Sequence, residues 1–304
     1  MIEYLIGIFL AILSAFIFSL GAILQKKGVE EMPDIKFDNI IDSVKAMLKN
    51  KIWVIGFIFG IVGGLPYFFA QYFVGVALSQ PLMGTGLLFV AIFAIKWLKE
   101  SLKFTEIIGI AILITAPILL SLGNVTNTAV QIADPGFLLS FLIFYIICFI
   151  AIGLSFLFYW KSNKFVSENM AANSGIFFGA GAMAAQLAVL ALRPLLSNNA
   201  FFITLNPFFI EYRPESDFFI AIFGFLILLI GNLVGTFVVQ IAFQKGKAAI
   251  VVPIQSAGNL LIPIVGGVLI FRQTIGNIIF FMIGIILMLF GTILLARLQV
   301  EAQA

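Results

Sequence analysis

Long apolar stretches separated by short polar segments dominate the chain. Windows of about 19 residues are apolar enough to form a membrane-spanning helix in nine places. Each stretch can cross a hydrocarbon core of about 30 Å as one helix, so the pattern predicts an all-α integral membrane protein. The expected spans cover residues 5–25, 52–74, 78–98, 104–122, 136–160, 171–192, 217–243, 248–271 and 276–296.

The segment between the first two spans has a different pattern. Its apolar residues recur at helical spacing along one side of residues 37–49, and its aspartates and lysines occupy the other side. A helix with two such faces is expected to lie along the membrane surface.

Composition supports a lipid environment. Of the 304 residues, 62% are hydrophobic and 10% are charged. A soluble domain of this length could not bury so much apolar surface in one core. Lysine and arginine are confined to the segments between spans, so we expect no nucleic-acid partner.

The distribution of positive charge predicts the orientation. With the N-terminus outside, the inner segments carry fourteen of the seventeen Lys and Arg residues, and the outer ones carry Arg193, Arg213 and Arg272. Cytoplasmic segments of membrane proteins are enriched in these residues. We therefore expect a multi-pass protein of the cell membrane with its N-terminus outside and its C-terminus inside.

The first and second halves of the chain have similar sequences. Gly7-Ile-Phe parallels Gly175-Ile-Phe, Gln71 parallels Gln240, Ala77-Leu-Ser-Gln-Pro parallels Ala249-Ile-Val-Val-Pro, and Leu98-Lys-Glu-Ser-Leu parallels Phe271-Arg-Gln-Thr-Ile. Prolines, glutamines and glycines align in order, which indicates an internal repeat.

The repeat predicts the domain organisation. A first four-helix repeat covers residues 1–122, including the surface helix at 37–49, and a second covers 171–298. One connecting transmembrane helix, 136–160, separates them, so matching helices enter the membrane from opposite sides. Inverted repeats of this kind are typical of carriers that alternate between two conformations.

The repeat and its Glu100-Ser-Leu102 element resemble the EamA-type repeat of the drug/metabolite transporter superfamily. Three features are similar to the NIPA-like group: the motif Leu24-Gln-Lys-Lys-Gly28, the surface segment, and nine spans in place of ten. That group is described as magnesium transporters. The second half departs from the pattern, because Gln273 stands where the first half has Glu100.

Glycines and prolines locate candidate helix breaks, where freed backbone groups can contact a solute. Four segments on the second, third, seventh and eighth spans carry them and are expected to face one cavity. The expected breaks are Gly64, Pro66, Pro81, Gly84, Gly235, Pro253 and Gly258.

Polar residues at membrane depth are the candidates for substrate binding, although amides and hydroxyls in bundles also hydrogen-bond simply between helices. The expected binding residues are Tyr67, Gln71, Tyr72, Thr85, Gln186, Asn232, Thr236, Gln240, Gln255 and Asn259. Gln25 and Arg193 are expected at the two mouths, where they would serve as interfacial anchors or in gating.

The chain has no histidine, and no charged residue is predicted near the bilayer centre. Intramembrane catalysis and a resident metal site therefore lack their usual residues, so we expect no enzyme and no cofactor. Tight binding of bare Mg²⁺ is also disfavoured, whereas a hydrated cation could pass along amides and carbonyls.

These observations favour a secondary transporter that exposes a small solute alternately to each side. The resemblance implies Mg²⁺ or another divalent cation, while a cavity of amides and aromatic rings better suits a small organic or lipid-linked solute. A channel or a non-transporting membrane scaffold is the alternative of a different class. The sequence does not determine the oligomeric state, and a homodimer is one alternative.

Overall fold

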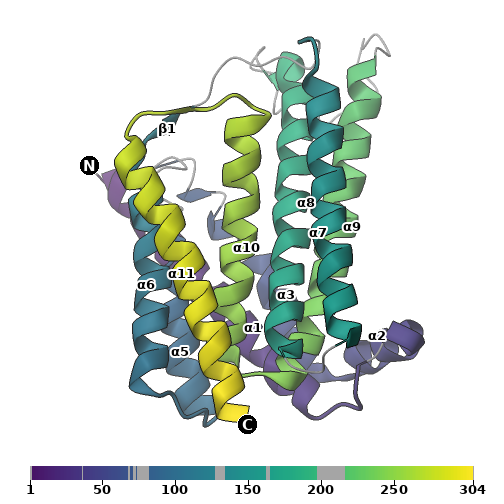
Figure 1. Ribbon diagram of the computed structural model, residues 1–304, viewed down its shortest axis with the longest axis vertical. Coiled ribbons are helices and arrows are strands. Elements are labelled where there is room, and N and C mark those ends of the chain that lie inside the picture. Colours follow the sequence, from purple (N-terminus) through teal and green to yellow (C-terminus); the bar gives the residue numbers. More distant parts are fainter. Residues whose placement is uncertain are drawn as a thin grey trace.

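The computed structural model describes residues 2–35, 37–67, 69–70, 73, 82–126, 134–161, 165–196 and 216–303. Over these ranges the chain is a helical bundle with one two-stranded ladder (Figure 1). Its elements are α1 (Ile2–Glu30), η1 (Phe37–Asn39), α2 (Ile40–Lys49), α3 (Lys51–Val62), α5 (Gly86–Trp97), α6 (Phe104–Leu122), β1 (Val125–Thr126), α7 (Phe137–Lys161), α8 (Val166–Leu196), α9 (Ser216–Lys245), α10 (Ala248–Leu269), β2 (Thr274–Ile275) and α11 (Ile278–Gln303).

Within the described part, six helices are long and apolar enough to cross a membrane: α1, α6, α7, α9, α10 and α11. A seventh candidate joins η1 and α2 to the helix that begins at Lys51, through a bend of 88°. Of the remaining helices, α5 has 12 residues and α8 has 31. The expectation of an all-α membrane protein with many spans is confirmed, and the layout of nine spans stays a prediction.

Helix α10 lies at the centre of the bundle. In Figure 1 it stands between α5, α6 and α11 on one side and α7, α8 and α9 on the other. Its first turn is fully buried from Ala248 to Val251. The amino end of α10 therefore meets neighbours on all sides.

Glycines allow the closest helix pairs to form. A Cβ added to Gly56 of α3 would lie 2.7 Å from the carbonyl oxygen of Gly21 in α1. A Cβ on Gly175 of α8 would lie 2.4 Å from the carbonyl oxygen of Gln255 in α10. Small residues of this kind let backbones approach in membrane bundles.

Three segments far apart in sequence, residues 26–35, 98–106 and 243–249, meet at one end of the bundle. We call this end the lysine-rich end. The Gln244 side chain donates to the carbonyl of Val29 at 3.0 Å, and Lys247 contacts Glu106 at 2.9 Å. Helix α2 lies at this end and projects beyond the bundle (Figure 1).

At the opposite end, backbone pairing joins two segments that are distant in sequence. Strand β1 pairs antiparallel with β2, and two further bonds run from Gly276 and Asn277 to the carbonyls of Asn124 and Gly123, at 3.1 and 2.9 Å. This ladder joins the end of α6 to the start of α11.

The turn after α5 ends that helix with a residue in the left-handed region. Lys99 has a φ of 56°, and the next amide, that of Glu100, donates to the carbonyl of Ala94 at 3.0 Å. A left-handed residue commonly ends a helix, although glycine usually fills the position.

The turn after α10 has the same backbone. Arg272 has a φ of 49°, and the amide of Gln273 donates to the carbonyl of Gly267 at 3.0 Å. These two turns were matched in the sequence comparison, and they lie at opposite ends of the bundle.

Three of the expected helix breaks are not breaks. Helix α9 runs continuously through Gly235, and α10 runs through Pro253 and Gly258. Membrane helices tolerate proline because surrounding groups satisfy the freed backbone. Gly258 serves instead to pack against Gly175, with an added Cβ 3.0 Å from its backbone. A helix does end before Gly63, and residues 84–85 form a turn before α5.

Candidate functional site

Two glutamines from distant parts of the chain meet inside the bundle. The side-chain amide of Gln240 in α9 donates to the side-chain oxygen of Gln25 in α1 at 2.7 Å and to the carbonyl of Thr236 at 3.1 Å. Gln240 is fully buried, and its own side-chain oxygen has no hydrogen-bond partner among the described residues. A buried acceptor left in this state can receive a hydrogen bond from water or from a hydrated solute.

Directly after Gln25, Lys26 is buried near the carboxyl end of α1. Its ammonium forms an ion pair with Glu30 at 2.8 Å and donates to the carbonyl of Phe243 in α9. Because a buried charge is costly unless paired and hydrogen-bonded, these contacts account for Lys26 at 5% exposure.

The end of α9 is bound by the segment after α1. Gln244 accepts a hydrogen bond from the amide of Ile35 at 2.8 Å and donates to the carbonyls of Val29 and Pro33, both at 3.0 Å. The segment after α1 is thereby fixed along α9.

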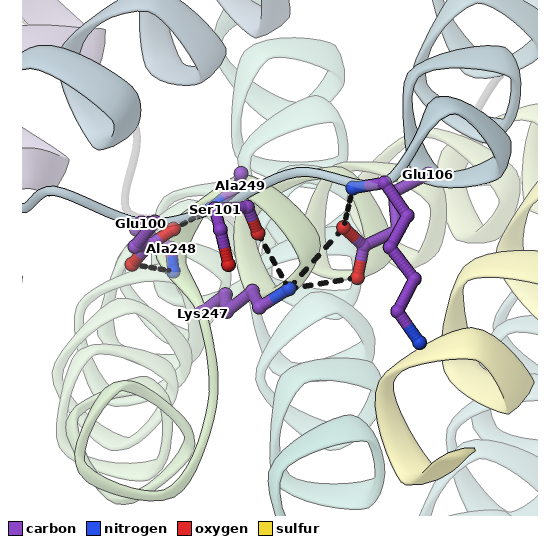
Figure 2. Close-up of polar contacts among 7 residues, drawn as sticks. Glu100, Ser101, Glu106, Lys247, Ala248 and Ala249 are labelled. Atoms are coloured by element: carbon purple, nitrogen blue, oxygen red, sulfur yellow. Dashed lines mark hydrogen bonds and ion pairs between the residues drawn. The ribbon is translucent and has the colours of Figure 1, made fainter. Parts of the chain in front are cut away.

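Glu100 caps the amino end of α10. Its carboxylate oxygens accept hydrogen bonds from the amides of Ala248 at 2.7 Å and Ala249 at 3.2 Å (Figure 2). The first amides of a helix lack partners within it, and the helix dipole favours an anion there. The carboxylate therefore joins the turn after α5 to α10.

Lys247, directly before α10, makes a second set of contacts, to the same turn and to the start of α6. Its ammonium donates to both carboxylate oxygens of Glu106, at 2.9 and 3.2 Å, and to the carbonyl of Ser101 at 2.7 Å (Figure 2). Glu106 is fully buried and also accepts from the amide of Lys103 at 2.7 Å, at the start of α6. A buried carboxylate with this many donors is fully compensated.

A polar cavity of about 280 Å³ opens at the lysine-rich end. Burial raises the pKa of Glu100, against the opposing effects of the Ala248 and Ala249 amides and the charge of Lys26. The charges around the cavity are mixed, so neither sign dominates it. Its lining residues are Lys26, Glu30, Glu100, Gln244, Lys245, Gly246 and Lys247.

Two of the expected binding residues hydrogen-bond within their own segment of the chain. Asn232 donates to the carbonyl of Leu228 in its own helix at 2.8 Å, and the Thr85 hydroxyl donates to that of Leu82 at 2.6 Å. Asn259 is exposed on α10. The half-buried side chains are Tyr67, Gln186, Thr236 and Gln255.

Other expectations cannot be placed. Gln71, Tyr72 and Pro81 lie outside the described residues, as does the side chain of Arg193, which belongs to α8. The expected mouth residue Gln25 and the expected cavity residue Gln240 are the pair that the structure brings into contact.

Sequence reasoning missed the polar network at the lysine-rich end. Lys247 and Gln244 have no local pattern that sets them apart from other residues between spans. Glu106 falls in an apolar span, and this position alone does not predict a buried carboxylate. The available signal was an acidic residue in the first turn of a helix, which often caps its own amino end. Its partner across the bundle had no sequence signal.

Long apolar helices, a buried amide pair and a polar network at one end together define a multi-span membrane protein. The chain matches the family described as "Magnesium transporter NIPA" over residues 2–300. It belongs to that family, which is one of membrane transporters.

Two curated relatives match parts of the chain. A "Probable magnesium transporter NIPA9" of Arabidopsis thaliana is 33% identical over 94 residues, which cover 31% of this chain and 27% of that protein. A "Magnesium transporter NIPA4" of Homo sapiens is 27% identical over 157 residues, covering 49% of this chain and 39% of that protein. The matches thus span less than half of each relative. No solved structure matches the chain.

Proposed function

We propose that this protein carries Mg²⁺ across the cell membrane by alternating access, with its N-terminus outside and its C-terminus in the cytoplasm. The observation that carries the proposal is the match to the magnesium transporter family over residues 2–300. The lysine-rich end is then the cytoplasmic end, in agreement with the distribution of positive charge.

The geometry of the two halves supports alternating access. The turns at Lys99 and Arg272 share a left-handed residue and the same closing hydrogen bond, yet they lie at opposite ends of the bundle. Helix α1 packs on α3 as α8 packs on α9, and a glycine lies at each contact. Two such halves facing opposite ways are the expected basis of a rocking carrier. We assign them to residues 1–122 and 171–298, joined by α7.

The route for the ion follows amides and carbonyls. No group of three or more His, Cys, Asp or Glu residues that could hold a metal occurs in the described part of the chain. Mg²⁺ dehydrates reluctantly and keeps several waters in most protein sites. The unpartnered oxygen of buried Gln240, beside Gln25, suits a water of the hydrated ion.

Flux into proteoliposomes tests the proposal. Purified protein should give saturable Mg²⁺ entry, read with an internal Mg²⁺ indicator, and counterflow when Mg²⁺ is present on both sides. Linear flux without saturation would indicate a channel. An absence of Mg²⁺ flux together with a thermal shift by an organic solute would replace the cation with that solute.

The amide pair is tested in the same assay. Gln240→Leu should slow Mg²⁺ flux while the protein still inserts and purifies, because Leu cannot donate to Gln25 or accept from the hydrated ion. Thr115→Val is the matched control, since Thr115 is exposed and donates only to Ala111 of its own helix. Equal flux in both variants would remove Gln240 from the route.

A further inference from the structure

We propose that Glu100 is a latch that holds the lysine-rich end closed, and that its release from α10 opens this end to the ion. The inference rests on the proposed alternating access, because it assigns a residue to one of the two gates.

The latch joins the two halves. Glu100 belongs to the turn after α5, in the first half, and its partners Ala248 and Ala249 begin α10, in the second half. Both bonds run from amides that have no partner within α10 to a carboxylate, and such bonds are stronger than bonds between neutral groups. No other acidic side chain in the described part accepts hydrogen bonds from the first amides of α10.

Lys247 extends the latch by one residue. It binds Glu106 of α6 and the carbonyl of Ser101, so three consecutive residues, 247 to 249, are held by the turn after α5 and the start of α6 (Figure 2). Contacts at consecutive residues resist both sliding and separation of the two segments.

The latch borders the polar cavity. Glu100 and Lys247 line the 280 Å³ space together with Lys26 and Gln244. Gln25 directly precedes Lys26 in α1, and Gln240 lies about one turn before Gln244 in α9. Separation of the turn after α5 from α10 would therefore widen this cavity toward the amide pair.

The matching turn at the opposite end has a different side chain. Gln273 folds against its own helix, because a Cβ added to Gly267 would lie 2.2 Å from its side-chain oxygen. The backbone of the two turns is the same, and the residue is a neutral amide in place of a carboxylate. This accounts for the departure of the second half from the Glu100 pattern: the ionic latch belongs to one end.

Thiol labelling can measure opening of this end. Thr236 is half-buried on α9 above Gln240, and Cys148 is the single cysteine of the chain, so Thr236→Cys in a Cys148→Ala background gives one reporter. A membrane-impermeant thiol reagent would be applied to the lysine-rich face of inside-out vesicles. In Glu100→Gln one acceptor oxygen becomes an NH₂ group, which leaves one of the two α10 amides without its partner, so the labelling rate should rise about tenfold.

Two variants control the experiment. Glu100→Asp keeps the charge but shortens the reach by one methylene, so it should also raise the labelling rate. Glu31→Gln removes an exposed acid at the same end and should leave the rate unchanged. Folding is checked by thermal unfolding in detergent.

Unchanged labelling in folded Glu100→Gln and Glu100→Asp would overturn the latch. Should neither variant fold, hydrogen exchange in the unaltered chain decides: slow exchange of the Ala248 and Ala249 amides supports the latch, and exchange at the rate of open amides overturns it. Labelling requires no transport, so a chain without Mg²⁺ flux but with an increased rate in Glu100→Gln would retain the latch and lose the proposed function.

Discussion

Glu106 and Lys247 form an ion pair whose two members differ in exposure. The Glu106 side chain is fully buried, whereas that of Lys247 is 24% exposed. Removal of one partner from a buried pair is costly because the other is left uncompensated. The cost should therefore depend on which partner is removed.

We predict that Lys247→Met destabilises the fold more than Glu106→Gln. The first leaves a buried carboxylate without its cation, at a cost of about 3 kcal/mol. The second leaves an ammonium that can turn to water, at a cost of about 1 kcal/mol. Thermal unfolding in detergent measures both, and equal losses would show that Glu106 is more hydrated than its burial indicates.

The raised pKa of Glu100 leads us to expect that the stability of the fold depends on pH. Burial raises its pKa above the ordinary 4.5, so the folded chain binds this proton more tightly than the unfolded chain does. Its contribution to stability is then present below about 4.5 and is lost as the pH rises through the raised pKa.

The wild-type protein should accordingly gain thermal stability relative to Glu100→Gln as the pH falls from neutral toward the ordinary carboxyl pKa of 4.5. The comparison with Gln removes the effects of all other titrating groups. A difference in Tm that stays constant with pH would mean that the Glu100 pKa is the same in the folded and unfolded chain.

At the scale of elements, much of the helix pattern could be predicted from the sequence. Length and hydropathy locate helices such as α6 and α11 well, because lipid demands long apolar segments with satisfied backbones. Helix breaks were harder to predict. Pro253 lies within a continuous α10, and the sequence did not predict this because local composition does not reveal which neighbours satisfy the backbone. The contact of Gln25 with Gln240, 215 residues apart, depends on packing that no local pattern encodes.

A glycine substitution tests the close packing of α3 on α1. Gly56→Ala should cost about 1–3 kcal/mol, because the new Cβ would lie 2.7 Å from backbone atoms of α1 and force it away from α3. Gly64→Ala is the control, since nothing lies within 4 Å of its Cβ position. Thermal unfolding of the two variants checks the contrast, and similar Tm values would contradict the close α1–α3 contact.

For the whole molecule, the difference between the two ends is the property on which the proposed alternating access depends. The sequence predicted it from charge, and the structure gathers the segments around Lys26, Glu100 and Lys247 at one end and the β1–β2 ladder at the other. Which end faces the cytoplasm is a matter for labelling in cells.

We expect an impermeant thiol reagent to label Pro135→Cys in intact cells and to spare Lys45→Cys until the membrane is opened. Both variants would be made in the Cys148→Ala background, and both positions are exposed. Labelling of the two from the same side would remove the inverted arrangement.

The pairing of α6 with α11 constrains how such a carrier can move. Leu295 and Leu113 lie so close to Gly109 and Gly291 that an added Cβ would come within 3 Å of each leucine, and the ladder fastens the far end of the same pair. One helix of this pair comes from each half, so the halves cannot part along it. In the proposed alternating access, the two halves would therefore rotate about the α6–α11 contact as an axis. The ion would enter and leave on the side of the bundle away from that axis.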